Sequence, residues 1–137
     1  MKYAISQICS LNWDFARDVH HYAAIGARAI TVVHGKLRSY GVEAGRKLLA
    51  ASGLEVAAYS SLGPFPLHER ERWDAELETC RREIGIAAEL GAPLVEMLTG
   101  SGRSHSYDET ESAFLAFLER LLPVAERAGV VLAFENN

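Results

Sequence analysis

The sequence predicts an α/β fold with a parallel sheet, as a partial (β/α)8 barrel of about five parallel strands and four helices. Short β-branched runs alternate with longer helical patterns along all 137 residues, and no change of composition marks a linker. We therefore expect a single domain over residues 1–137. Ligands of such sheets bind at the carboxyl ends of the strands.

Composition limits the class of protein and its partners. An apolar content of 49% with a net charge of −4 is typical of a folded chain with a hydrophobic core. Cys9 and Cys80 have no partner at metal-site spacing, so we expect two reduced thiols and a cytoplasmic protein. The mild acidity argues against nucleic-acid binding, and the uncharged stretches are too short to span a membrane. The predicted partner is a small molecule.

The first half of the chain contains three expected strands and two expected helices. The strands are β-branched runs at Lys2 to Ile8, Ala29 to Val33 and Leu54 to Tyr59. One helix is expected to begin near Asn12, a good N-cap, and to end at Gly26. The other is expected from about Tyr40 to Ala51, before Ser52-Gly53.

The second half begins with a loop, Ser60 to Pro66, in which two prolines and a glycine predict irregular structure. The long helix expected from His68 to Leu90 has apolar residues at spacings of 4, 3, 4 and 3, which lie on one side of a helix: Trp73, Leu77, Cys80, Ile84 and Ala87. A strand at Pro93 to Leu98 and a glycine-rich turn follow. Asp108 with Glu111 predicts the start of a last helix, which Pro123 should kink or divide.

Two parallel folds are compatible with this order of elements. An open sheet of flavodoxin or receiver type suits the length, but it needs a last helix that this chain lacks, and a receiver domain carries Asp and Lys where this chain has Ser60 and Asn136. Each βα unit takes roughly 31 residues, so eight units need about 250, the typical length of a (β/α)8 barrel. We therefore expect half a barrel, whose open sheet edges favour pairing with another chain or a homo-oligomer.

The last strand ends in a carboxylate. Its alternation puts bulky residues on one face and smaller residues, ending in Glu135, on the other: Val130, Leu132 and Phe134 against Val131, Ala133 and Glu135. The bulky face suits helix packing, which leaves Glu135 in the mouth of the barrel, where this architecture carries catalytic or metal-binding groups. The alternative is that Glu135 is only the first polar residue after a strand. Similarly, Glu96 is either an inward polar residue or a sign of a different register.

Other polar residues follow the remaining strands. His34 ends the second expected strand, Ser60 the third, and Thr99 the fourth, where it opens a glycine-rich loop. Asn136 follows the last strand. A surface histidine and ordinary turn residues are the alternative interpretation of these positions.

Three short stretches resemble the xylose isomerase-like barrel superfamily, which contains the sugar phosphate isomerases and epimerases. The ending AGVVLAFEN (128–136) is similar to its fifth-strand motif, ELGAPLV (89–95) to the junction before its fourth strand, and LLPVAERAGV (121–130) to the helix before its fifth strand. The resemblance follows the whole chain in element order but covers only the N-terminal half of the family's barrel.

The resemblance implies a function and a role for Glu135. This residue matches the family's first metal ligand, which can also take part in proton transfer next to a carbonyl. The implied protein is a sugar or sugar phosphate isomerase or epimerase dependent on Mn²⁺, Mg²⁺, Co²⁺ or Zn²⁺, with its other ligands (Asp, His and a second Glu) on strands absent here. A carbohydrate substrate would be contacted at the mouth by His34, Ser60, Thr99 and Asn136. Alternatives are an inosose-type dehydratase, an abasic-site endonuclease, or a non-catalytic parallel α/β module.

Overall fold

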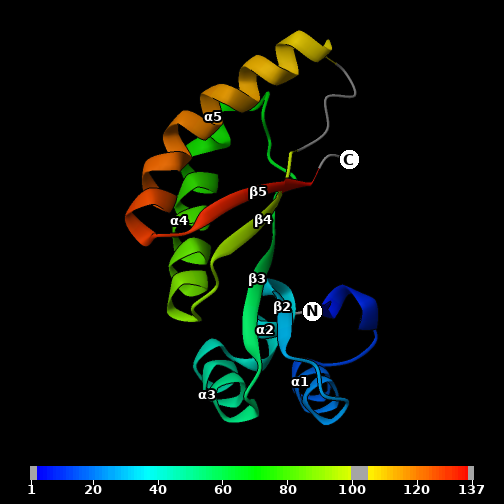
Figure 1. Cartoon of the computed structure of the whole chain (residues 1–137). Helices are drawn as coiled ribbons and strands as arrows, with labels where there is room; N and C mark the ends of the chain where they lie inside the picture. Colours follow the sequence, from blue (N-terminus) through cyan, green and yellow to red (C-terminus); the bar gives the residue numbers. More distant parts are fainter. Residues whose placement is uncertain (1–2, 100–104, 136–137) are drawn as a thin grey trace.

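Five parallel strands form one sheet in the order β1-β2-β3-β4-β5 (Figure 1). This computed structural model describes residues 3–99 and 105–135, apart from the side chain of Ser61. The strands are β1 (Ala4–Ser6), β2 (Ala29–Val33), β3 (Glu55–Leu62), β4 (Leu94–Leu98) and β5 (Val131–Glu135). Each strand pairs with its neighbour in sequence, as expected for successive units of a (β/α)8 barrel.

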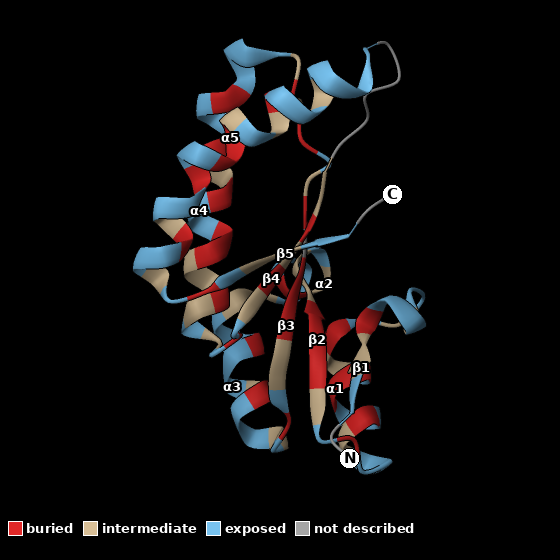
Figure 2. Ribbon diagram, turned by 45° about the horizontal axis from the view of Figure 1, so that its top comes forward, coloured by how far each residue is buried: buried red, intermediate tan, exposed pale blue. Residues whose placement is uncertain are grey.

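The helices lie to one side of the sheet (Figures 1 and 2). They are α1 (Phe15–Ala24), α2 (His34–Tyr40), α3 (Val42–Ser52), α4 (Trp73–Glu89) and α5 (Tyr107–Ala128), with short 3-10 helices η1 (Gln7–Ser10) and η2 (Arg70–Arg72). Among the described residues, every helix is too short or too polar to cross a lipid bilayer.

The expectation of four helices is wrong, because a fifth helix, α2, follows β2 directly. Leu37, which is fully buried, anchors α2 in the core. Gly41 then separates α2 from α3 with a φ of 103°, in the region that glycine adopts without strain. The expected helix from Tyr40 to Ala51 is therefore α3, and the segment expected to be a loop before it is helical.

Two strands differ in length from those expected. β1 ends at Ser6 because Gln7 turns into η1, where its side chain bonds to Asp18 and to the backbone of Val33. β3 continues to Leu62 through the segment expected to be irregular. The register of β3 with β4 shifts between Tyr59 and Leu62, and this irregularity lets the strand keep pairing.

Helix starts also differ, because capping depends on which side chain reaches the first turn. α1 is capped by Asp14 rather than Asn12, through a 2.8 Å bond from the amide of Arg17. α4 starts at Trp73 rather than His68. The capping box of α5 consists of Ser106 and Glu109 rather than Asp108 and Glu111. α5 runs as one helix through Pro123, so the proline does not divide it.

The core lies between the sheet and the helices. The stripe predicted for α4 is buried: Trp73, Leu77, Cys80, Ile84 and Ala87 are each 3% exposed or less. On β5, the ring of Phe134 packs edge-to-face against Phe114 of α5, with centroids 5.0 Å apart. Because strand residues alternate, Val131 and Glu135 face away from the helices, as expected.

We call the face of the sheet away from the helices the inner face. Strand alternation and register assign to it Ser6, Thr31, Val33, Ala58, Ser60, Leu94, Glu96, Leu98, Val131, Ala133 and Glu135. Exposure along it rises from the centre of the sheet, where Ser60 is 1% exposed, to the edge, where Val131 is 64% exposed. Glu96 is thus an inward polar residue, and its position in β4 does not indicate a shifted register.

Candidate functional site

The inner face carries two carboxylates near the carboxyl ends of adjacent strands. Glu135 ends β5, is exposed, and lies opposite Leu98 in the register of β4 with β5. Glu96 lies opposite Ala133, two residues before Leu98 on the same face. The Cα atoms of the two glutamates are therefore about 8 Å apart, since strands are spaced by about 4.8 Å and residues by about 3.3 Å.

Ser60, near the end of β3, is on the inner face as well, opposite Val33 of β2. Tyr59 lies opposite Val95 and Leu62 opposite Met97, so the register of β3 with β4 is irregular between them, and Ser60 and Glu96 are not a register pair. Ser60 is buried, whereas Glu96 is partly exposed. The structure therefore places Glu135 and Ser60, which the sequence singled out, on the same face of the sheet as Glu96, with the two glutamates on adjacent strands.

The other residues singled out by the sequence lie around this group. Thr99 follows β4 directly and is partly exposed. His34 begins α2 at the end of β2, and its ring Nδ1 is buried without a hydrogen-bond partner in the part of the chain that the structure describes. Asn136 lies outside the described residues. A buried polar atom without a partner costs about 1–3 kcal/mol, so the Nδ1 of His34 is a position where a ligand would gain a bond.

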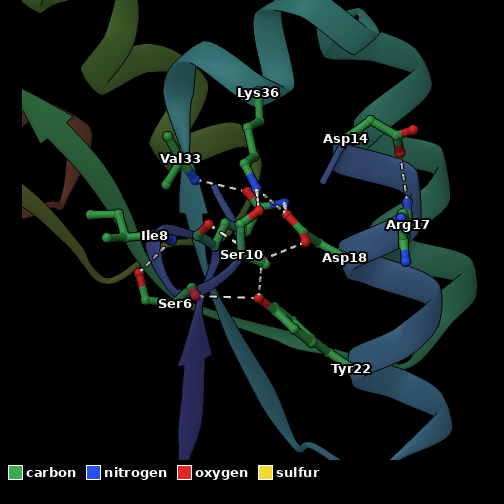
Figure 3. Close-up of polar contacts among 10 residues, drawn as sticks. Ser6, Ile8, Ser10, Asp14, Arg17, Asp18, Tyr22, Val33 and Lys36 are labelled. Atoms are coloured by element: carbon green, nitrogen blue, oxygen red, sulfur yellow. Dashed lines mark hydrogen bonds and ion pairs between the residues drawn. The ribbon is translucent and has the colours of Figure 1, made fainter. Parts of the chain in front are cut away.

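A polar cluster that sequence reasoning missed lies at the carboxyl ends of β1 and β2 (Figure 3). Asp18 of α1, fully buried, accepts bonds from Gln7 Nε2 at 3.0 Å, Ser10 Oγ at 2.6 Å and Lys36 Nζ at 2.7 Å. Gln7 Oε1 in turn accepts a 2.9 Å bond from the amide of Val33. Asp18 lies three residues after Phe15 and four before Tyr22, on the apolar face of its helix, and this spacing was a signal of its burial.

The cluster around Asp18 is structural. The Lys36 ammonium and the Asp18 carboxylate neutralise each other, and Lys36 also donates to the carbonyl of Ser10 at 2.7 Å. The bonds of the cluster join η1, α1, the end of β2 and, through Lys36, α2. The cluster therefore fixes the first turn after β1 beside β2 and leaves no free charge there for a ligand.

A second buried carboxylate, Glu83 of α4, lies on the helix side of the sheet. It accepts a 2.6 Å bond from the hydroxyl of Tyr59 and pairs with Arg38 at 3.2 Å and Arg82 at 3.5 Å. Burial, and then the bond to Glu83, raise the pKa of Tyr59 well above its ordinary value. These groups join α2, α4 and β3 and do not face the inner side.

Two histidines, in the loops that follow β3 and β4, are in contact with each other. The rings of His68 and His105 stack at a centroid distance of 3.5 Å and an angle of 6°. His68 Nε2 is bonded to the hydroxyl of Thr110 at 3.2 Å. The stack joins the loop after β3 to the start of α5. It holds the two imidazole rings against each other and brings neither of them to the carboxylates of the inner face.

The described residues alone do not complete a metal site. Glu135 supplies one hard oxygen ligand, but residues 3–99 and 105–135 contain no group of three or more His, Cys, Asp or Glu side chains that would hold an ion. Divalent cations in proteins take four or more ligands. The donor chemistry of Glu135 fits such an ion, and a site built on it would need further ligands from outside the described residues.

The family model of the xylose isomerase-like TIM barrel matches residues 19–137. No curated protein sequence matches the chain. A solved protein of Sinorhizobium meliloti is 25% identical, with a TM-score of 0.87 over 96% of this chain and 49% of that protein.

Two further solved structures share the fold. The IolI protein with a bound zinc atom is 17% identical, with a TM-score of 0.88 over 99% of this chain and 51% of its own. A sugar phosphate isomerase/epimerase of Parabacteroides distasonis is 14% identical, with a TM-score of 0.75 over 99% of this chain and 51% of its own. The chain thus spans about half the length of each of these three solved proteins.

Proposed function

Because the chain belongs to the xylose isomerase-like TIM barrel family, we propose that it forms the N-terminal half of a divalent-metal-dependent sugar or sugar phosphate isomerase or epimerase. The observation that carries this proposal is the position of Glu135. Its side chain is on the inner face at the carboxyl end of β5, and (β/α)8 enzymes hold their reacting groups at the carboxyl ends of their strands.

Glu135 has two proposed roles in this reaction. Its carboxylate oxygens supply one ligand to the divalent ion, which polarises the carbonyl and hydroxyl of the sugar when bound. The same carboxylate can take the proton from the carbon next to that carbonyl and return it to the neighbouring carbon in an isomerisation, whereas an epimerisation needs a second group to deliver a proton on the opposite face. No Lys or Arg of the described residues is ion-paired with Glu135, so its charge is free for both roles.

The surrounding polar groups would hold the sugar. His34 offers a buried ring nitrogen that has no hydrogen-bond partner within residues 3–99 and 105–135, and Ser60 and Thr99 offer hydroxyls at the ends of β3 and β4. Asn136 is proposed as a further contact on the strength of its place after Glu135. Each of these groups exchanges hydrogen bonds with hydroxyls, which suits a carbohydrate.

The proposal is tested in the full-length protein by two measurements. Titration with Mn²⁺ or Co²⁺ by calorimetry should show binding that Glu135→Ala weakens at least about tenfold, as loss of a metal ligand does. NMR in D₂O should show deuterium entering a ketose at the carbon next to its carbonyl, and Glu135→Gln should abolish this exchange. Glu119→Ala, which removes an exposed carboxylate of α5, is the matched control. Equal Mn²⁺ affinity in Glu135→Ala would exclude the ligand assignment.

A further inference from the structure

The carboxyl ends of β3 and β4 come into close contact at Gly63. This residue follows Leu62, which lies opposite Met97 in β4. A Cβ atom at Gly63 would overlap the backbone carbonyl oxygen of Leu98, the last residue of β4. The φ of Gly63 is 88°, a conformation that residues with a side chain rarely adopt. The close approach of the two strand ends therefore requires a glycine.

The segment around Gly63 is anchored on both sides, so it cannot move away from β4. Leu62 before it and Phe65 after it are each 4% exposed. The ring of Phe65 packs against Phe117 of α5, with centroids 4.8 Å apart. Leu98, in contrast, is partly exposed. Because protein interiors are close-packed, a side chain added at Gly63 displaces the end of β4 rather than the anchored segment.

The end of β4 is also the neighbour of Glu135. Leu98 lies opposite Glu135 in the register of β4 with β5, and the strands β3, β4 and β5 are adjacent in the sheet (Figure 1). Parallel strands are joined by backbone hydrogen bonds, so a displacement of Leu98 is passed on to β5. β5 yields to it because its residues are exposed or partly exposed.

From these contacts we infer that Gly63 is a positioning residue for Glu135. Its missing side chain lets the end of β4 hold the Glu135 carboxylate where that group binds the divalent ion. This inference rests on the proposed function, and Gly63 acts through Leu98 rather than by contact with the ion. Metal affinity is sensitive to such residues, since loss of a group that orients a ligand weakens binding about 10–100-fold.

The test is titration of the full-length protein with Mn²⁺ by calorimetry. Gly63→Ala should weaken Mn²⁺ binding at least about tenfold. Two other alanine variants are matched controls. Gly53→Ala places a side chain at a φ of 75° with nothing within 4 Å of its Cβ, and Gly45→Ala introduces an overlap with Leu37 between α2 and α3. Neither control should change Mn²⁺ affinity, because neither alters the ends of β4 and β5.

A second measurement uses wild-type protein and so does not depend on the folding of Gly63→Ala. In two-dimensional amide NMR spectra, the diamagnetic ion Zn²⁺ should shift the signals of Gly63 and Leu98 and leave the signal of Gly45 in place. Coupling between two positions is reciprocal, so a residue that sets the position of the metal ligand should respond when the metal binds.

The outcomes separate this inference from the proposed function, with far-UV circular dichroism to establish that each variant is folded. Three results would overturn the positioning role while Glu135 remained a metal ligand. They are unchanged Mn²⁺ affinity in folded Gly63→Ala, an equal loss of affinity in Gly53→Ala or Gly45→Ala, and signals of Gly63 and Leu98 that Zn²⁺ does not shift. Failure of the wild type to bind Mn²⁺ would overturn the proposed function itself, and the positioning role with it.

Discussion

At the scale of single residues, Glu83 is the carboxylate whose removal should cost most stability. It is 1% exposed and serves both Tyr59 and Arg38. Glu83→Ala leaves a buried hydroxyl and a guanidinium without their acceptor, so we expect the free energy of unfolding in urea to fall by about 3 kcal/mol. Glu78→Ala, which breaks only an exposed pair with Arg81, should change it by less than about 0.5 kcal/mol. Similar losses in both variants would contradict this role.

Tyr59 should make the protein less stable in alkali. Desolvation raises its pKa in the folded state, so the folded protein keeps a phenol proton that the unfolded chain releases above about pH 10. The contribution of Tyr59 is therefore complete below that pH and is lost as the pH rises toward the folded-state pKa, by about 1.4 kcal/mol per unit. Urea unfolding between about pH 9 and 11 should show a shallower decline in Tyr59→Phe. Parallel pH curves for the wild type and Tyr59→Phe would argue against this contribution of Tyr59.

The two cysteines should differ sharply in reactivity. Cys9 is exposed, whereas Cys80 is fully buried, and burial raises the pKa of its thiol to about 12. Since the thiolate is the reactive form, iodoacetamide at neutral pH should label Cys9 in the native protein and Cys80 only after unfolding. Peptide mass spectrometry measures both sites in one sample. Rapid native labelling of Cys80 would show that α4 opens readily.

At the scale of elements, the close approach of α3 to α1 and α2 depends on Gly45. A Cβ at this position would overlap Leu37 and lie 3.2 Å from the ring of Phe15. Gly45→Ala should therefore lower the free energy of unfolding by about 1–3 kcal/mol, although alanine favours the helix. Gly85 of α4 has nothing within 4 Å of its added Cβ. Gly85→Ala should thus stabilise the protein by up to about 1 kcal/mol in the same urea experiment, and a loss there would contradict the packing argument.

Apart from α2, the existence of each α-helix and strand that the structure describes was predictable, because periodicity is a local property. The stripe of α4 and the alternation of β5 were both predicted, and both are found. Element ends were predicted less well, because they depend on distant partners: Gln7 stops β1 by bonding to Asp18 and Val33. For the same reason β3 continued beyond Tyr59, since Leu62 pairs with Met97 of a strand more than thirty residues later.

At the scale of the whole molecule, the sheet has open edges at β1 and β5 and an inner face with exposed Val131. Prepared on its own, the 137-residue chain should self-associate with rising concentration, because unpaired edge strands and apolar surface favour contact between copies. Val131→Lys should reduce the association, as a charge on an edge strand does. Analytical ultracentrifugation of both chains measures the effect. A concentration-independent monomer would show that the edges are protected.

The sequence by itself determined the order of the strands and of the helices other than α2, the faces of β5 and the place of Glu135 at a strand end, because each depends on residues within one short segment. The tertiary structure decided that Glu96 lies opposite Ala133, that Asp18 meets Lys36 and that His68 stacks on His105. The last two contacts depend on how helices and loops pack, and the neighbours across the sheet depend on strand register, which shifts between Ile30 and Thr31 and again between Tyr59 and Leu62. Such shifts are set by packing between distant segments, so no local pattern carries them.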